Sequence, residues 1–145
     1  MSVSETVHAS CVAIDGRGVL ILGRSGAGKS DLTMRLIDRG AMLVSDDYTL
    51  LRAVEGRVVA SPPPNIAGTI EMRGVGIVER PFASDVPIAL AVDLDLPPER
   101  MPEPVTRDFA GMAVPVIGLN GLEPSAPMKV EAALQLHGLP LFWPK

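Results

Sequence analysis

The chain has 145 residues, a formal net charge of −4 and a pI near 5.1. This length is typical of one compact domain, which we expect to span residues 1–145, and the acidic balance argues against nucleic acid as the main partner. Cys11 is the one cysteine, which excludes an internal disulfide and a cysteine-based zinc site and suits a reducing cytoplasm. We recognise neither a secretory signal nor an apolar stretch long enough to cross a membrane.

The first third of the chain predicts a hairpin that leads into a glycine-rich loop and a helix. Residues 9–14 and 19–22 are β-prone and enclose a turn at 15–18. From residue 30 onward, apolar residues fit a helix, and Gly40 is suited to end that helix after Arg39. A short apolar strand is expected at 41–44.

The remaining segments predict mainly strands. Residues 48–54 and 57–60 form a hairpin, 87–93 and 112–119 are buried strands, and 126–136 is a closing helix. Because strands outnumber helices, we expect an α/β fold with a mixed sheet and several antiparallel hairpins, not a regular βαβ alternation.

Residues 23–30 match the full P-loop pattern between a hydrophobic strand and an amphipathic helix. Glycines let successive N–H groups point at phosphate oxygens, and the start of the helix adds its positive dipole end. The lysine neutralises phosphate charge and the serine hydroxyl ligates Mg²⁺. The pattern predicts a site for the phosphates of Mg·ATP, with the residues Gly23, Arg24, Ser25, Gly26, Ala27, Gly28, Lys29 and Ser30.

Two carboxylates, Asp46 and Asp47, follow the strand at 41–44. A P-loop enzyme needs a carboxylate near Mg²⁺, and a second one can accept the proton of an attacking hydroxyl. The alternative is a solvated turn or a cap for the next segment. A further pair, Asp93 and Asp95, is interpreted as a turn into the prolines that follow.

In combination, these features resemble the catalytic domain of the HPr kinase/phosphorylase family. That family carries a histidine before a P-loop, a strand ending in paired aspartates, and the signature Glu-x-Arg-Gly-x-Gly-Ile. Here the histidine is His8 and the signature is residues 71–77. The resemblance covers about residues 7–80 and implies a P-loop nucleotide-binding fold related to phosphoenolpyruvate carboxykinase.

The resemblance also implies an activity and roles for single residues. Family members are ATP-dependent serine kinases of HPr, the small phosphocarrier of the sugar phosphotransferase system, and many assemble into hexamers. Asp47 would be the general base, assisted by Asp46, and Glu71 and Asp47 would join Ser30 at the magnesium. His8 and Arg73 would support the reacting phosphoryl group.

These added residues also have plainer readings. His8 could be a polar residue at the start of a strand. Glu71 and Arg73 would share a face if their segment is extended, and could be a surface ion pair of little energetic value. The glycines of the signature could only shape a bend.

Three departures from the family pattern matter. Typical members carry an N-terminal domain before the catalytic one, and we expect this chain to be a short form without it. The family has a downstream active-site arginine, for which Arg100 is the nearest match and Arg107 a competitor. The family segment Val-Arg-Pro-Gly-Arg-Asn, tied to phosphorolysis, corresponds here to residues 122–129, where Lys129 is the one cation. Lysine cannot reproduce an arginine fork on phosphate, so we expect weak or absent phosphorylase activity.

Two other functions stay open at this stage. A small-molecule kinase would use the same P-loop, although the signature at 71–77 argues against it. A regulatory module that binds ATP without transferring phosphate is the other alternative, because the downstream arginines are missing.

Overall fold

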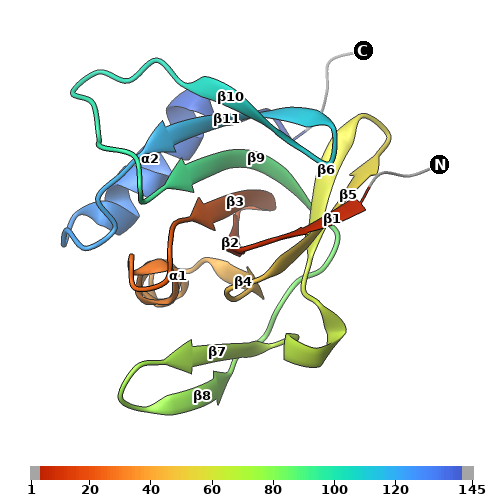
Figure 1. The fold of residues 1–145 in the computed structure, drawn as a ribbon, viewed down its shortest axis with the longest axis vertical. Helices are drawn as coiled ribbons and strands as arrows, with labels where there is room; N and C mark the ends of the chain where they lie inside the picture. The colour runs from red at the N-terminus through yellow and green to blue at the C-terminus, as the bar shows by residue number, and fades with distance from the viewer. Residues whose placement is uncertain (1–3, 142–145) are drawn as a thin grey trace.

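The computed structural model describes residues 4–141. Within this range the chain forms a nine-stranded mixed sheet, a separate two-stranded hairpin and two α-helices (Figure 1). The strands of the main sheet are β1 (Ser4–Val7), β2 (Ala9–Ile14), β3 (Arg17–Leu22), β4 (Met42–Ser45), β5 (Thr49–Val54), β6 (Arg57–Ser61), β9 (Val86–Asp93), β10 (Val105–Phe109) and β11 (Met112–Gly118). The hairpin consists of β7 (Thr69–Met72) and β8 (Gly76–Glu79). The α-helices are α1 (Lys29–Asp38) and α2 (Ala126–His137), and a short 3₁₀ turn, η1, spans Pro64–Ile66.

The sheet has the order β1-β5-β6-β9-β3-β2-β4, and β11 adds to β9 with β10 beyond it. β9 is its centre, since it pairs in parallel with β3 and β11 and antiparallel with β6. The remaining neighbours are antiparallel pairs, three of which are hairpins between consecutive strands. The expected mixed α/β sheet is therefore confirmed.

Both faces of the central strands are buried. Alternate residues of a strand point to opposite faces, so Val19 and Ile21 pack with Leu32 and Leu36 of α1 and with α2 on one side. Leu20 and other residues of the opposite face pack against β5, β6, β10 and β11, which curl over that side. Strands buried on both faces read as continuous apolar runs, which is why 19–22 and 87–93 were predictable.

The helix α1 begins and ends as its sequence predicts. Gly28 precedes it with φ of 98°, and Gly40 follows Arg39 with φ of 110°. The N–H of Gly40 donates to the carbonyl of Ile37, and the N–H of Ala41 donates to that of Leu36. This pair of bonds is a Schellman motif, which requires the left-handed conformation that glycine adopts without strain.

The edge strands β1 and β10 were not predicted. Four of the five residues of β10 are exposed and polar or weakly apolar, so the strand lacks the buried alternation that marks a strand in a sequence. Its strand pairing is with β11, and Phe109 and Arg107 anchor it through the core and through Asp93. No helix of the described residues is long and apolar enough to span a bilayer.

Candidate active site

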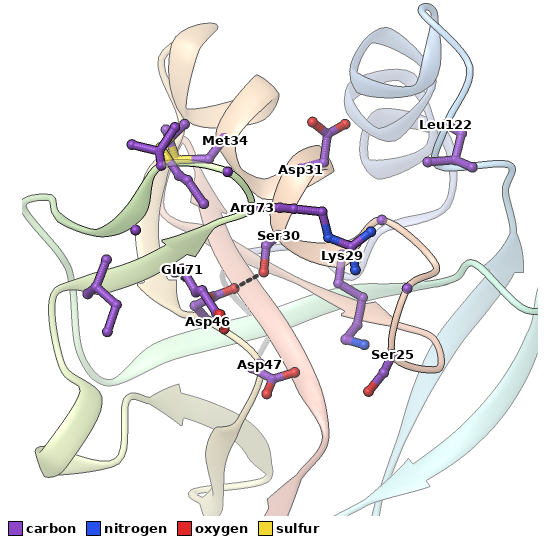
Figure 2. A pocket seen from close by; sticks show the side chains of 17 residues that line it. Ser25, Lys29, Ser30, Asp31, Met34, Asp46, Asp47, Glu71, Arg73 and Leu122 are labelled. Atoms are coloured by element: carbon purple, nitrogen blue, oxygen red, sulfur yellow. Dashed lines mark hydrogen bonds between the residues drawn. The ribbon is translucent and has the colours of Figure 1, made fainter.

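A cavity of about 830 Å³ lies where β3 and β4 end, between α1 and the β7–β8 hairpin (Figure 2). The predicted phosphate site and the signature segment both contribute to it, because the sheet brings the carboxyl ends of β3 and β4 to one edge. Its lining residues are Ser25, Gly26, Gly28, Lys29, Ser30, Asp31, Met34, Asp46, Asp47, Glu71, Met72, Arg73, Gly74, Val75, Gly76, Ile77 and Leu122.

Residues 23–28, called the glycine loop here, wrap around the start of α1. Gly26 and Gly28 have φ of 86° and 98°, which favours glycine, and a Cβ on Gly28 would come within 2.8 Å of Leu122. The first N–H groups of a helix have no partner inside the helix and carry its positive dipole end. The loop and the first turn of α1 can therefore bind an anion in the cavity.

Lys29 is 6% exposed and holds the glycine loop closed. Its ammonium group donates to the carbonyls of Gly23 and Arg24, at 2.7 and 3.1 Å. An ammonium has three N–H donors, so one remains for a ligand in the cavity that Lys29 lines.

Asp46 is a buried carboxylate with donors on both oxygens. One oxygen accepts from the hydroxyls of Ser30, at 2.6 Å, and Ser10, at 3.1 Å. The other oxygen accepts from the N–H of Glu71, at 3.1 Å. Asp46 therefore joins three elements of the site: α1, β2 and the β7–β8 hairpin.

Asp47 points elsewhere, although it is the next residue. Its carboxylate lies 2.8 Å from Nε2 of His8, and both side chains are substantially exposed, at 51% and 39%. The His8 ring stacks on Tyr48, with the ring centroids 5.1 Å apart. His8 thus contacts Asp47 and is not among the lining residues of the cavity in residues 4–141, whereas the sequence-based expectation placed it at the reacting phosphoryl group.

The signature segment forms the β7–β8 hairpin, which stands apart from the main sheet (Figure 1). Glu71 belongs to β7, whereas Arg73 lies in the turn, so the two do not form one extended segment. Gly74 and Gly76 shape this turn with φ of 82° and 130°. Both Glu71 and Arg73 line the cavity.

No function was expected for the turn after β9, but this turn holds the glycine loop. Asp95 accepts from the backbone N–H of Arg24, at 2.9 Å, and from its guanidinium. The N–H of Asp95 donates to Asp93, whose other oxygen accepts from Arg107 at 3.0 Å. The turn at 93–96 was expected; its role as an anchor becomes visible only when β9 lies beside β3.

Ser10 is the other polar residue that the sequence did not single out. It is fully buried and bonds to both aspartates, through the carboxylate of Asp46 and the N–H of Asp47. An isolated serine inside an apolar strand gives no signal of this kind.

Three cations considered in the sequence analysis lie outside the lining of the cavity. Arg100 is exposed in the loop between β9 and β10, and Arg107 pairs with Asp93. Lys129 forms an ion pair with Glu123 at 2.6 Å, and this hydrogen bond lowers the pKa of the Glu123 carboxyl. The cations lining the cavity among residues 4–141 are Lys29 and Arg73.

The lone thiol is not a candidate nucleophile. Cys11 is fully buried, and burial raises the pKa of its thiol far above the ordinary range. Because the thiolate is the reactive form, Cys11 is a core residue.

The donor set at Ser30 is of the kind that accepts Mg²⁺ together with a nucleotide. Among residues 4–141, no three His, Cys, Asp or Glu side chains lie close enough to hold a metal ion by themselves. Mg²⁺ in nucleotide sites is commonly held by one or two carboxylates together with substrate phosphates and waters. The Ser30 hydroxyl and the Asp46 carboxylate are in contact, and Glu71 lines the same cavity. These residues fit Mg²⁺ as an incomplete set that phosphates would complete.

The family model described as HPr Serine kinase C-terminal domain matches residues 1–83, which is more than half of the chain. The chain belongs to this family. Relatives named HPr kinase/phosphorylase, from Clostridium tetani and Caldanaerobacter subterraneus, are 41% and 43% identical to it over 75 residues. These stretches cover 52% and 51% of the chain but 25% of each relative, so the chain spans about a quarter of the length of the curated relatives it matches.

A solved structure extends the likeness beyond residue 83. The structure titled HPr(Ser) kinase/phosphatase from Coxiella burnetii matches with a TM-score of 0.80 and 29% sequence identity. The match covers 92% of this chain and 95% of that one. The second half of this HPr kinase family member therefore keeps the fold even though the family model does not reach it.

Proposed function

We propose that the protein is an ATP-dependent serine kinase that phosphorylates an HPr-type phosphocarrier protein. The observation that carries the proposal is one cavity lined by Ser30, Asp46, Asp47 and Glu71. Asp46 is bonded to Ser30 and to the N–H of Glu71, and Asp47 is bonded to His8. Family membership and the names of the relatives support the same reaction and the same substrate class.

In this proposal the glycine loop is a P-loop for the β- and γ-phosphates of ATP. Lys29 and Arg73 neutralise charge that develops on the transferred group, and the N–H groups at the start of α1 orient it. We assign Ser30 and Asp46, with Glu71 beside them, to the Mg²⁺ that accompanies the nucleotide. That ion would supply charge neutralisation and orientation of the phosphates. Phosphoryl transfer needs such positioning more than covalent chemistry.

Asp47 is the proposed general base for the acceptor hydroxyl. Its carboxylate is half exposed, so it is open to a protein substrate, and His8 fixes its direction through Nε2. Asp46 is buried and accepts three hydrogen bonds, so its position is fixed, which suits it to the magnesium side of the site. This division departs from the sequence-based assignment of Asp47 to the metal.

We further propose that phosphorolysis is weak or absent. In the segment that replaces the arginine motif, Leu122 lies against Gly28 of the P-loop and presents no charge. Lys129, the remaining cation there, is neutralised by Glu123. If phospho-HPr and inorganic phosphate gave pyrophosphate at a rate near that of the kinase reaction, this part of the proposal would be wrong.

The decisive measurement is transfer of label from γ-labelled ATP to purified HPr in the presence of Mg²⁺. Wild type, Asp47→Asn and Lys29→Ala are compared with Arg52→Ala, which breaks an exposed ion pair with Asp85 far from the cavity lining. We expect labelled phosphoserine with wild type and Arg52→Ala, and its loss in the other two variants. Tight ATP binding without transfer by wild type would favour the regulatory module instead.

A further inference from the structure

We infer that Ser10 is a positioning residue that holds Asp46 and Asp47 in their two different directions. The inference rests on the proposed function, since it explains how adjacent carboxylates come to serve the metal side and the acceptor side of one reaction. Neither the family signature nor the P-loop pattern includes this serine.

The hydroxyl of Ser10 is used in both its capacities. It donates to the carboxylate of Asp46, at 3.1 Å, and accepts from the backbone N–H of Asp47, at 2.9 Å. The residue is 0% exposed, so water cannot replace either bond. A hydroxyl has one proton to donate, which makes Asp46 the fixed partner of that proton. One side chain therefore orients two consecutive residues.

The backbone at this point needs such support. Asp47 has φ of 68°, a left-handed conformation that few residues other than glycine adopt, and the N–H of Tyr48 donates to the carbonyl of Asp46 at 2.8 Å. β4 also carries one extra residue opposite β2, since Cys11 pairs with Ser45 but Val12 pairs with Leu43. Bulges and strained turns of this kind re-aim side chains and persist only when neighbours hold them.

His8 and Ser10 approach the aspartate pair from one short stretch of chain, since His8 lies in the bend between β1 and β2 and Ser10 is the second residue of β2. His8 meets the carboxylate of Asp47, and Ser10 meets its backbone and the carboxylate of Asp46. Removing the Ser10 hydroxyl would leave the Asp47 N–H without its acceptor and leave Asp46 held only by the Ser30 hydroxyl and the N–H of Glu71.

The test compares Ser10→Ala with Thr49→Val in phosphoryl transfer to HPr. Thr49 is also fully buried and donates one hydroxyl bond, to the carbonyl of Ala9, without contacting either carboxylate. For Ser10→Ala we expect kcat to fall by about tenfold or more, as for supporting residues around a reacting group, with the KM for ATP changed by less than about threefold. Thr49→Val should lower the melting temperature and keep kcat.

A second readout separates this inference from the proposed function. Binding of a fluorescent ADP analogue is measured with and without Mg²⁺, and Ser10→Ala should lose most of the gain that Mg²⁺ gives to wild type. If wild type fails to phosphorylate HPr but this loss occurs, the kinase proposal fails while the role of Ser10 stands. If Ser10→Ala has the kcat and the Mg²⁺ dependence of wild type, the inference is overturned. Should Ser10→Ala not fold, Ser10→Cys, a weaker donor of similar size, must show the same losses.

Discussion

Residues 4–83 and residues 84–141 contribute to the candidate active site in different ways. The first part supplies the glycine loop, both aspartates and the β7–β8 hairpin, and from the second part Leu122 alone lines the cavity among the described residues. The polar residues of the second part that approach the site bond to its scaffold, as Asp95 does to Arg24. The residues that line the cavity are therefore concentrated in the part that the family model matches, and the second part mainly contributes contacts that hold the glycine loop and α1 in place.

This division separates two kinds of constraint. Groups that touch a nucleotide must keep their identity and spacing, so they form motifs. Groups that hold a loop in place need only a carboxylate or a guanidinium in reach, as with Arg35 of α1, which donates to the carbonyls of Gly121 and Glu123. Supporting contacts of this kind leave little trace in a sequence.

The largest effect on kcat is expected for Asp47→Asn, and it is compared with the small effect expected for Arg100→Ala. Loss of Asp47, the proposed general base, should lower kcat by about 10²–10⁴-fold. Arg100 is exposed outside the cavity lining, so its loss should change kcat by less than about threefold, an effect too small for a transition-state contact. Steady-state transfer to HPr measures both. A large loss with Arg100→Ala would break the comparison, because it would mean that the loop at 94–104 reaches the site during the reaction.

The second prediction asks whether the two parts fold as one unit. Leu36 of α1 and Leu90 of β9 are both 0% exposed and lie in the same core cluster. Replacing either by alanine should lower the free energy of unfolding by about 2–5 kcal/mol, in a single transition seen by both circular dichroism and nucleotide binding. Two separate transitions in Leu90→Ala would show that residues 4–83 fold without the second part.

In both parts, the sequence predicted the features that depend on local patterns and missed those that depend on distant contacts. The hairpin at 9–22, the helix α1 and the buried strands at 87–93 and 112–119 were predictable, because burial and turn residues repeat at short range. That Ser30 lies near the 46–47 aspartate pair was also predictable, since both follow strands that end at one edge, but the sequence-based assignment placed Asp47 beside Ser30 and the structure places Asp46 there. Ser10 and Asp95 were not, because their partners lie 36 and 71 residues away. The edge strand β10 escaped because it has almost no buried face.

A smaller effect is expected from the anchor of the P-loop. Asp95→Ala removes the acceptor of the Arg24 N–H and of its guanidinium, so the loop should bind phosphates less well. Because both side chains are partly exposed, we expect the KM for ATP to rise by only about five- to tenfold, with kcat nearly unchanged. Arg52→Ala, which breaks a comparable exposed pair, is the control. An unchanged KM would mean that the loop keeps its shape without the second part.

The smallest effect concerns an ion pair that joins the two parts directly. Arg39, just after α1, donates two hydrogen bonds to Glu131 of α2, at 2.9 and 2.7 Å. These bonds lower the pKa of the Glu131 carboxyl, and the attraction of the guanidinium adds to them against the opposing effect of partial burial. A carboxyl whose pKa is lower in the folded state stabilises the fold above its ordinary pKa and loses that contribution as the pH falls through the lowered value.

Glu131→Gln should therefore reduce the melting temperature slightly at pH 7, and the difference from wild type should vanish in acid. Glu103→Gln, an exposed loop residue, should show no difference at either pH. If the melting temperatures of Glu131→Gln and wild type still differed below the lowered pKa, the contact would act through packing and not through charge.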